Sequence, residues 1–140
     1  MYKVFKRGDV VLADLGEVKD KETGNSVQMG VRPCIVTSND SGNTYGTILN
    51  VIPLSSASTK LIKVLPTHVI FTPENSSVKM ISVSMAEQIT TIDLKQVKKS
   101  KPLFTLNDDL MRKVDITILI QQGLSKYFEL ANLQQITYAM

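Results

Sequence analysis

The sequence is poor in the side chains that build metal centres and disulfides. Its 140 residues include one cysteine, one histidine and no tryptophan. A lone cysteine, Cys34, excludes an internal disulfide, and a reducing cytoplasm is the expected compartment. Cys34 lies in an apolar strand pattern, which favours a small core residue over a nucleophile. One histidine and one cysteine cannot form a zinc cage, and the acids lack the spacing of a calcium loop, so no metal site is predicted.

Long apolar runs and an extreme charge are also missing. No apolar run approaches the roughly 20 residues that cross a bilayer, and residues 1–9 have no apolar stretch behind their charges. We therefore expect neither a membrane span nor a secretory signal. The net charge of +3 permits a polyanionic partner without requiring one. The length favours a single domain over residues 1–140, with its own core.

Several catalytic signatures do not occur. The chain has no glycine-rich phosphate loop and no serine flanked by glycines. His68 is the single histidine, so a histidine pair is excluded, and we interpret it as a support or rim residue rather than a base. The densest basic run is interpreted as a solvated loop, with phosphate contact as the alternative. It consists of Lys95, Lys98, Lys99 and Lys101.

What the sequence does contain is a series of short strands separated by turn signals. Strands are predicted over about 9–15, 32–38, 47–54, 61–71 and 79–88. Pro53 is expected to end the third strand because it cannot donate a hydrogen bond to a neighbour. The polar loop 16–30 is longer than a hairpin needs, which is typical of functional loops. Residues 39–43 are predicted to form a turn, and with no helix between the strands we expect an antiparallel barrel or sandwich.

The last third of the chain has a helical pattern. Thr105 or Asn107 is the expected cap, and Asp108 and Asp109 add negative charge to the first turn. Apolar residues then recur at helical spacing up to Gly123, and residues 124–140 could form a second helical piece. The apolar face is wide for a helix on one barrel, which favours a dimer contact. The predicted layout is a barrel over about 7–100 and a helical part over about 105–140.

Arg32 is the most informative residue, because it stands where the long loop becomes a buried strand. Its guanidinium is planar and permanently charged, which suits a phosphate whose negative charge is growing. Pro33 biases Arg32 toward extended geometry. Such a site can cleave RNA, since the ribose 2′-OH is a nucleophile that the substrate itself carries. Ser55, expected just after the third strand, could hydrogen-bond the phosphate, although a serine there is more often only a turn residue.

Four segments, taken in order over about residues 6–120, resemble the MazF/PemK/Kid family of toxin endoribonucleases. They are Arg7–Leu15, Gly30–Pro33 with its following strand and Asn39, Leu65–Val69, and Glu87–Asp93. The resemblance implies a mainly β fold, an SH3-like antiparallel β-barrel with a C-terminal helix, in a homodimer. It further implies metal-independent and cofactor-free cleavage of single-stranded RNA by the 2′-OH, leaving a 2′,3′-cyclic phosphate and a 5′-hydroxyl. A MazE-like antitoxin would block the RNA groove.

The resemblance assigns roles residue by residue. Arg32 matches the family's catalytic arginine, and Ser55 stands where most members have threonine; either hydroxyl can donate to a phosphate. Carboxamide edges suit the readout of unpaired bases, which fits Gln88. The predicted RNA-binding residues are Ser26, Gln28, His68, Glu87 and Gln88.

The chain also departs from the family pattern. Val27 replaces the acid that many members carry in the first loop, so Glu22, Asp20 or water would have to assist proton transfer, or the enzyme would be slower. The tail beyond about Gly123 is longer than expected. Two other functions stay open at this point: a CcdB-like toxin that poisons DNA gyrase by binding, and an inactive module that only binds the antitoxin.

Overall fold

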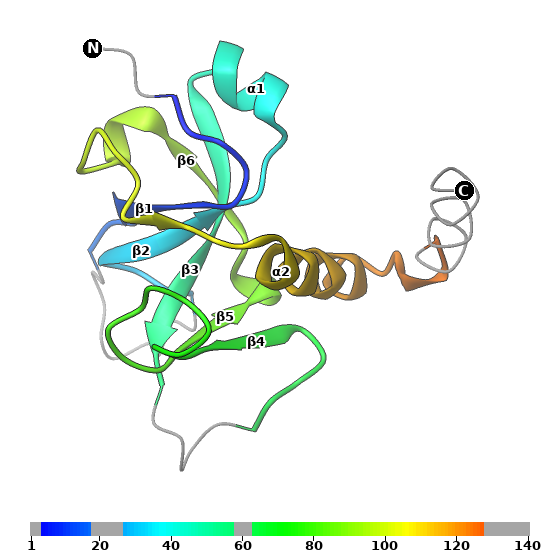
Figure 1. The fold of residues 1–140 in the computed structure, drawn as a ribbon. Coiled ribbons are helices and arrows are strands. Elements are labelled where there is room, and N and C mark those ends of the chain that lie inside the picture. The colour runs from blue at the N-terminus through cyan, green and yellow to red at the C-terminus, as the bar shows by residue number, and fades with distance from the viewer. Residues whose placement is uncertain (1–3, 18–26, 58–62, 128–140) are drawn as a thin grey trace.

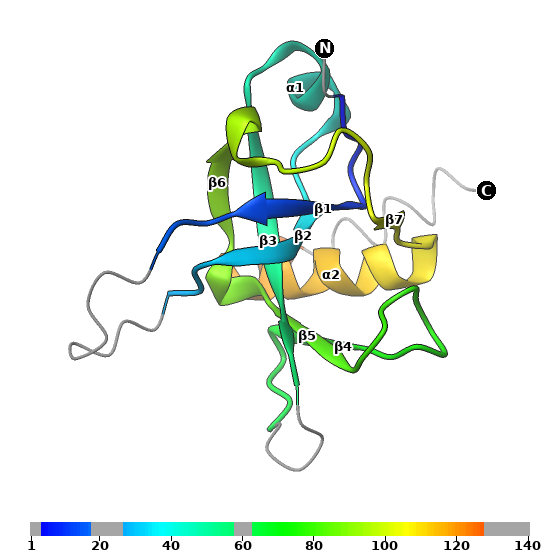
Figure 2. The same cartoon turned by 90° about the vertical axis from the view of Figure 1, so that its left-hand side faces the viewer.

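A computed structural model describes residues 4–17, 27–57 and 63–127. These residues form an antiparallel sheet that curls into a half-barrel, with the long helix α2 packed against one face (Figures 1 and 2). The strands are β1 (Asp9–Asp14), β2 (Val31–Val36), β3 (Ile48–Ser56), β4 (His68–Phe71), β5 (Ser82–Met85), β6 (Thr90–Asp93) and β7 (Phe104–Thr105). The helices are α1 (Asp40–Tyr45) and α2 (Asp108–Gln121), with short 3-10 turns η1 (Ala86–Gln88) and η2 (Leu94–Gln96). The predicted fold class is confirmed.

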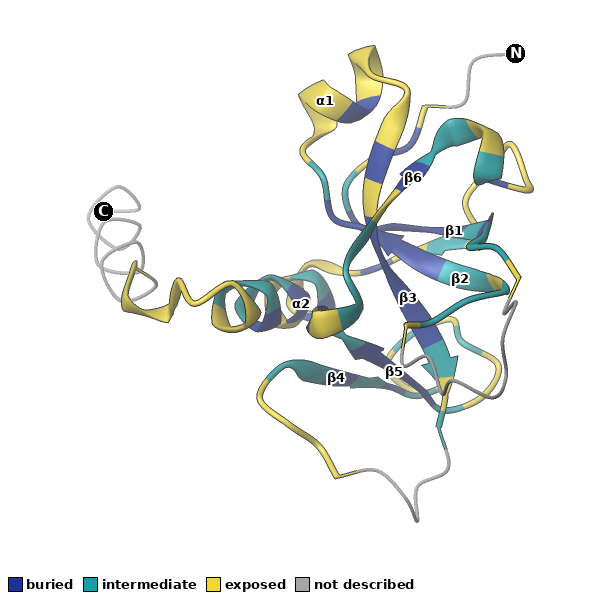
Figure 3. Ribbon diagram, turned by 180° about the vertical axis from the view of Figure 1, so that it is seen from behind, coloured by how far each residue is buried: buried dark blue, intermediate teal, exposed yellow. Residues whose placement is uncertain are grey.

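The strand order is β4-β5-β3-β2-β1-β7, and β6 also pairs with β3. Successive side chains of a strand point to opposite faces, so the sheet buries two apolar clusters. The helix-side core contains Val10, Ile35, Ile52, Leu54, Val69, Phe71, Ala86, Leu106, Leu110 and Val114. The opposite core contains Phe5, Val11, Ala13, Cys34, Val36, Leu49, Val51, Ile92 and Val97. Figure 3 shows this burial along the middle of the strands and on the sheet side of α2.

The prediction that Pro53 ends the third strand is wrong, because β3 continues to Ser56. Its first part, Ile48–Val51, pairs with β6, and its last part, Leu54–Ser56, pairs with β5. Pro53 lies between these two parts of β3, on the edge where the partner changes from β6 to β5. Neither strand pairs with Pro53 there, so neither requires the N–H that proline lacks. Ser55 is therefore a strand residue and not the turn residue that the sequence suggested.

Other boundaries also differ from the predictions. The expected fifth strand is shorter and runs into η1, and β6 and β7 were not predicted. The fourth strand begins only at His68, after Pro66. The expected turn at 39–43 instead opens α1, where the Asn39 side chain accepts a hydrogen bond from the Gly42 N–H at 2.7 Å. Local side-chain hydrogen bonds of this kind leave no apolar periodicity in the sequence.

Helix α2 begins and ends close to where the pattern indicated. Asn107 is the cap, and its side chain accepts from the Leu110 N–H at 2.9 Å. Thr105, the alternative cap, belongs to β7 and donates its hydroxyl to Asp9. The helix ends at Gln121, and Gly123 adopts a left-handed φ of 73° that a helix cannot continue through. Most of the predicted second helical piece lies outside the described residues.

The N-terminal segment ties the helix to the sheet. The Arg7 guanidinium forms a two-pronged ion pair with Asp115 of α2, and its Nε donates to the Thr37 carbonyl at 2.9 Å. The Arg7 backbone N–H donates to Asp40 of α1 at 2.7 Å. One residue thus joins both helices to the end of β2. Within the described part of the chain, no helix has the length and apolarity needed to span a membrane.

Cys34 is a buried core residue, as predicted. Burial raises the pKa of its thiol to about 12, although the nearby Arg32 charge acts in the opposite direction. A thiol that stays protonated at neutral pH is a poor nucleophile. The chemistry of this protein therefore has to come from other side chains.

Candidate functional site

Arg32 and Ser55 contact each other across β2 and β3. The two strands are antiparallel with Cys34 opposite Pro53, so the same register brings Arg32 next to Ser55. Arg32 Nη1 donates to Ser55 Oγ at 3.0 Å, and Nε donates to the Met29 carbonyl at 2.5 Å. The strand fixes the backbone of Arg32 while these two acceptors hold its guanidinium over the base of the first loop. Sequence reasoning missed the Met29 carbonyl, since a backbone group leaves no signal in residue type.

Gln28 and Gln88 join this pair from two other parts of the chain. The Gln28 side chain donates from Nε2 to Ser55 Oγ, and the Gln28 backbone N–H donates to Gln88 Oε1 at 2.9 Å. The structure therefore brings together four of the predicted site residues: Gln28, Arg32, Ser55 and Gln88. Ser26 lies outside the described residues, as do Asp20 and Glu22.

The Ser55 hydroxyl is oriented by what it accepts. A serine oxygen has two acceptor lone pairs and one O–H donor. Arg32 Nη1 and Gln28 Nε2 both donate to Ser55 Oγ, which occupies the two lone pairs. The hydroxyl proton is left to donate to a further acceptor, such as a phosphate oxygen.

No acid among the described residues neutralises the Arg32 charge. In that part of the chain, no carboxylate oxygen lies within 4.0 Å of its guanidinium, and Nη2 makes no hydrogen bond. Gln28 Oε1 is buried and has no hydrogen-bond partner among the same residues. An unpaired buried acceptor is costly, so this oxygen is a natural place for a donor on a bound molecule. The described part of the site thus offers a cation and an acceptor side by side.

His68 and Glu87 form a second polar group. His68 Nε2 lies 3.2 Å from Glu87 Oε2, and His68 Nδ1 accepts from the Leu65 N–H at 3.3 Å. Because Nδ1 accepts, Nε2 carries the proton of a neutral imidazole and donates it to Glu87. Thr67 Oγ1 donates to Glu87 Oε1 at 3.2 Å. Burial alone would raise the pKa of Glu87, but hydrogen bonds from its own backbone, His68 and Thr67 lower the pKa below its ordinary value.

The two polar groups lie on the two strands that flank β5, with Ser55 on β3 and His68 on β4. Ser55 pairs with Val83, and His68 pairs with Met85, two residues further along the same strand. Paired residues share a face, so His68 and Ser55 both lie on the face of the sheet opposite α2. Glu87 directly precedes Gln88, which links the second group to the first along the chain.

The first loop, residues 16–30, begins and ends at glycines with left-handed backbones. Gly16 has a φ of 99° and Gly30 a φ of 85°, and the Gly30 N–H donates to the Gly16 carbonyl at 2.7 Å. A residue with a Cβ would be strained at either position. A cleft of about 90 Å³ opens beside the base of this loop and includes Val27, Gln28 and Gln88 in its lining. Val27, where the resemblance led us to expect an acid, is 61% exposed there.

The described residues contain no group of three or more histidine, cysteine, aspartate or glutamate side chains that could hold a metal ion. All four lysines of the basic run are exposed, and Lys98 Nζ lies 3.8 Å from Asp14 Oδ2. Exposure fits a solvated segment and phosphate contact equally, so both interpretations of this run stay predictions.

Comparison with known proteins gives a consistent result. Residues 6–121 match a family model described as "PemK-like, MazF-like toxin of type II toxin-antitoxin system". An endoribonuclease MazF of Staphylococcus epidermidis is 35% identical over 124 residues, which cover 89% of this chain and 96% of the relative.

Solved structures agree on the fold. An endoribonuclease from a mycobacterial species, in complex with its cognate antitoxin, superposes with a TM-score of 0.66 at 20% identity, covering 86% of this chain and 97% of the other. MazF from Deinococcus radiodurans superposes with a TM-score of 0.65 at 18% identity and the same coverage of both chains. At these identities the superpositions support the half-barrel with its C-terminal helix.

Proposed function

The chain belongs to the PemK-like, MazF-like toxins of type II toxin–antitoxin systems, and we propose that the hydrogen-bonded group of Gln28, Arg32, Ser55 and Gln88 cleaves its RNA substrate. The protein is an endoribonuclease toxin, like the staphylococcal relative that matches most of its length. The observation that carries the proposal is the Arg32–Ser55 contact. It couples a guanidinium that no described acid neutralises to a hydroxyl whose proton can donate to a phosphate.

The reaction needs little chemistry from the protein, because the attacking group belongs to RNA. The 2′-OH gives up its proton to water or to an acid of the first loop as its oxygen attacks the adjacent phosphorus. The bond to the 5′ oxygen of the next nucleotide breaks, and that oxygen takes up a proton from water. The products are a 2′,3′-cyclic phosphate and a 5′-hydroxyl. Arg32 offers Nη2 to the phosphate oxygens, whose charge grows in the transition state. Ser55 donates its hydroxyl to one of the same oxygens.

Gln28 and Gln88 position this pair and face the nucleotide. The Gln28 backbone is tied to Gln88, so the loop base and the end of η1 are held together. Gln28 Oε1, buried and without a partner among the described residues, accepts a hydrogen bond from the bound ribose or base. Single-stranded RNA suits such a site, because unpaired bases expose their edges to carboxamides. Glu87, His68 and Ser26 extend the RNA-binding surface in this proposal.

The proposal includes two protein partners. A MazE-like antitoxin is the first, because the mycobacterial structure is described as an endoribonuclease with its cognate antitoxin. A second copy of this chain is the other. The exposed apolar residues Ile120, Leu124 and Tyr127 follow one another at and beyond the end of α2, and such a patch favours burial in a homodimer. We place the protein in the cytoplasm, where its RNA substrate is found.

The proposed chemistry predicts the ends of the RNA fragments. Full-length protein incubated with a mixed-sequence single-stranded RNA in EDTA should still cleave it. Every new downstream fragment should carry a 5′-hydroxyl, detected by direct labelling with polynucleotide kinase. Every upstream fragment should carry a 2′,3′-cyclic phosphate, detected by its resistance to phosphatase until acid opens the ring. Sequencing the ends would also reveal the recognised sequence. Fragments with 5′-phosphates would contradict attack by the 2′-OH.

Ser55 gives a sharper test of how the phosphate is held. Ser55→Ala should slow cleavage about 100-fold, the loss typical of one donor to a developing oxyanion. Ser55→Thr keeps the hydroxyl and suits a strand, so it should retain most of the activity. Initial cleavage rates of the wild type and the two variants are measured on one short RNA. Equal melting temperatures of the three proteins would show that a difference in rate comes from the chemistry and not from folding. Equal rates for the alanine and threonine variants would remove Ser55 from the mechanism.

A further inference from the structure

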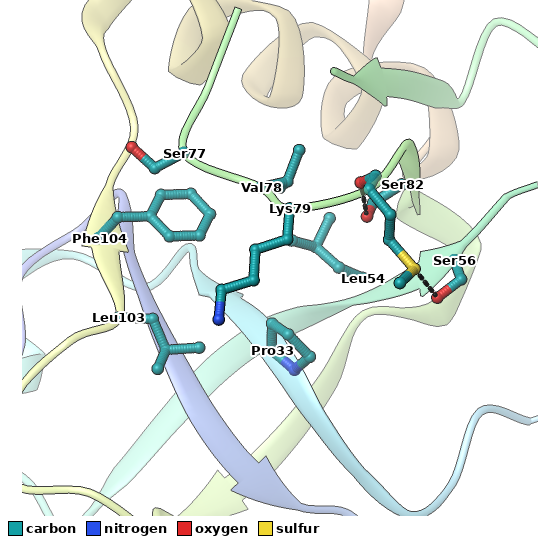
Figure 4. A pocket seen from close by; sticks show the side chains of 10 residues that line it. Pro33, Leu54, Ser56, Ser77, Val78, Lys79, Ser82, Leu103 and Phe104 are labelled. Carbon is teal, nitrogen blue, oxygen red and sulfur yellow. Dashed lines mark hydrogen bonds between the residues drawn. The ribbon is translucent and has the colours of Figure 1, made fainter. Parts of the chain in front are cut away.

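A second hollow lies behind the strands that carry Arg32 and Ser55. Pro33 and Leu54 line it, and because they alternate with Arg32 and Ser55 they face the other side of the sheet. Its volume of about 420 Å³ lies within the range of about 300–1,000 Å³ that is usual for small-molecule sites. We call it the Lys79 pocket. Its lining residues are Pro33, Leu54, Ser56, Ser77, Val78, Lys79, Met80, Ser82, Leu103 and Phe104 (Figure 4).

The walls of the Lys79 pocket are mainly apolar. In Figure 4 the ring of Phe104 and the side chain of Leu103 border it on one side, with Leu54 and Val78 on the other. Leu103 is 38% exposed and Met80 is 59% exposed. Apolar surface left open to water in a concave site is stabilised when an apolar body covers it. The walls therefore favour a ligand with an apolar chain or ring.

Part of the wall is held in place by hydrogen bonds. The Ser56 hydroxyl donates to Met80 Sδ at 3.2 Å, and the Ser82 hydroxyl donates to the Met80 carbonyl at 3.0 Å. Both donors are fixed to the same residue from two neighbouring strands. A pre-ordered wall lowers the entropy that binding would otherwise cost.

Lys79 supplies the charge. Figure 4 shows its side chain extending across the pocket, with the ammonium group toward Pro33 and Leu103. The lining residues include no acid, and among the described residues no carboxylate oxygen lies within 4.0 Å of Lys79 Nζ. A cation beside apolar walls, without a described counter-ion, complements a single negative charge on an otherwise apolar molecule.

We propose that the Lys79 pocket binds a small amphipathic anion, an apolar chain or ring that carries one carboxylate or sulfonate. The apolar body packs between Phe104, Leu54 and Val78, and the anion pairs with the Lys79 ammonium. The nuclease reaction uses none of these side chains, so this site is separate from the one around Arg32.

The probe for this site is 1-anilinonaphthalene-8-sulfonate, an aromatic body with one sulfonate. Its fluorescence should rise on titration of the full-length protein, saturate at one molecule per chain, and be reversed by decanoate. Amide NMR shifts should change at residues 77–82 and 103–104. Non-saturating binding, or shifts confined to the end of α2, would overturn the proposal.

Charge variants separate the two parts of the ligand. Lys79 is exposed, so Lys79→Glu should fold normally and weaken probe binding about tenfold or more. Lys79→Met keeps the apolar stem and should lose less. The neutral analogue N-phenyl-1-naphthylamine should bind Lys79→Glu as well as it binds the wild type. Arg32→Ala should leave probe binding unchanged whether or not it abolishes RNA cleavage. Equal affinity of Lys79→Glu and the wild type for 1-anilinonaphthalene-8-sulfonate would contradict the proposed charge pairing.

Discussion

Arg32→Ala should lower the rate of RNA cleavage about 1,000-fold or more, the loss expected for an arginine that stabilises a phosphoryl transition state. The reason lies in the contacts of this side chain. Two acceptors fix its guanidinium, Nη2 makes no hydrogen bond to the described residues, and no described carboxylate lies within 4.0 Å to absorb its charge. Single-turnover rates on a short cleavable RNA measure the effect. Growth of cells that express the variant should be normal.

The matched control is Arg32→Lys. It keeps the positive charge but loses the planar fork, so it should recover part of the rate and not all of it. Arg7→Ala serves as a second control, because the Arg7 guanidinium is engaged by Asp115 and Thr37, away from Ser55. It should affect thermal stability more than chemistry. If Arg32→Ala cleaves at the wild-type rate while remaining folded, the proposed site is wrong.

Phe5→Ala should destabilise the fold severely. Phe5 is 1% exposed and fills the opposite core, although it lies before the first strand. Truncating a buried phenylalanine to alanine typically costs about 3–5 kcal/mol, against a total of about 5–15 kcal/mol for a folded domain. We expect a lower urea midpoint and a melting temperature reduced by roughly 10 °C or more.

The neighbouring residue provides the control for Phe5. Val4 is 49% exposed, so Val4→Ala should change the free energy of unfolding by no more than about 0.5 kcal/mol. Urea unfolding followed by far-UV circular dichroism compares the two variants directly. A Phe5→Ala protein as stable as Val4→Ala would mean that the N-terminal segment does not belong to the core.

The sequence allowed good predictions where one strong physical signal acted locally. Apolar runs bounded by turn-forming residues indicated β1 and β2, and helical periodicity after a cap at Thr105 or Asn107 indicated α2. The predictions failed where pairing between distant segments determines where a strand lies or ends. The end of β3 could not be predicted from Pro53, because a proline is tolerated at that position only through the change of partner from β6 to β5. The two-residue strand β7 is likewise defined by its pairing with β1.

The candidate site shows the same division. Arg32 could be singled out from its neighbours in sequence, since its position before Pro33 and a buried strand is a local property. The contact of Gln28 with Gln88 joins residues 60 positions apart, and no local pattern contains it. Ser55 was selected on a wrong premise, as a residue beyond a strand. Its hydroxyl nonetheless contacts Arg32, because the two residues follow the last β2–β3 pair, Cys34 and Pro53, on facing strands.

Because β3 changes partner along its length, the alignment of the proposed catalytic residues depends on two hairpin systems. Arg32 is carried by β2, which is braced by β1, whereas Ser55 belongs to the stretch of β3 braced by β5 and β4. Substitutions in either system can therefore alter how well the guanidinium and the hydroxyl are aligned without touching RNA. Substitutions in the interior can therefore change the toxin's cleavage activity in small steps. They leave unchanged the exposed side chains that an antitoxin would contact.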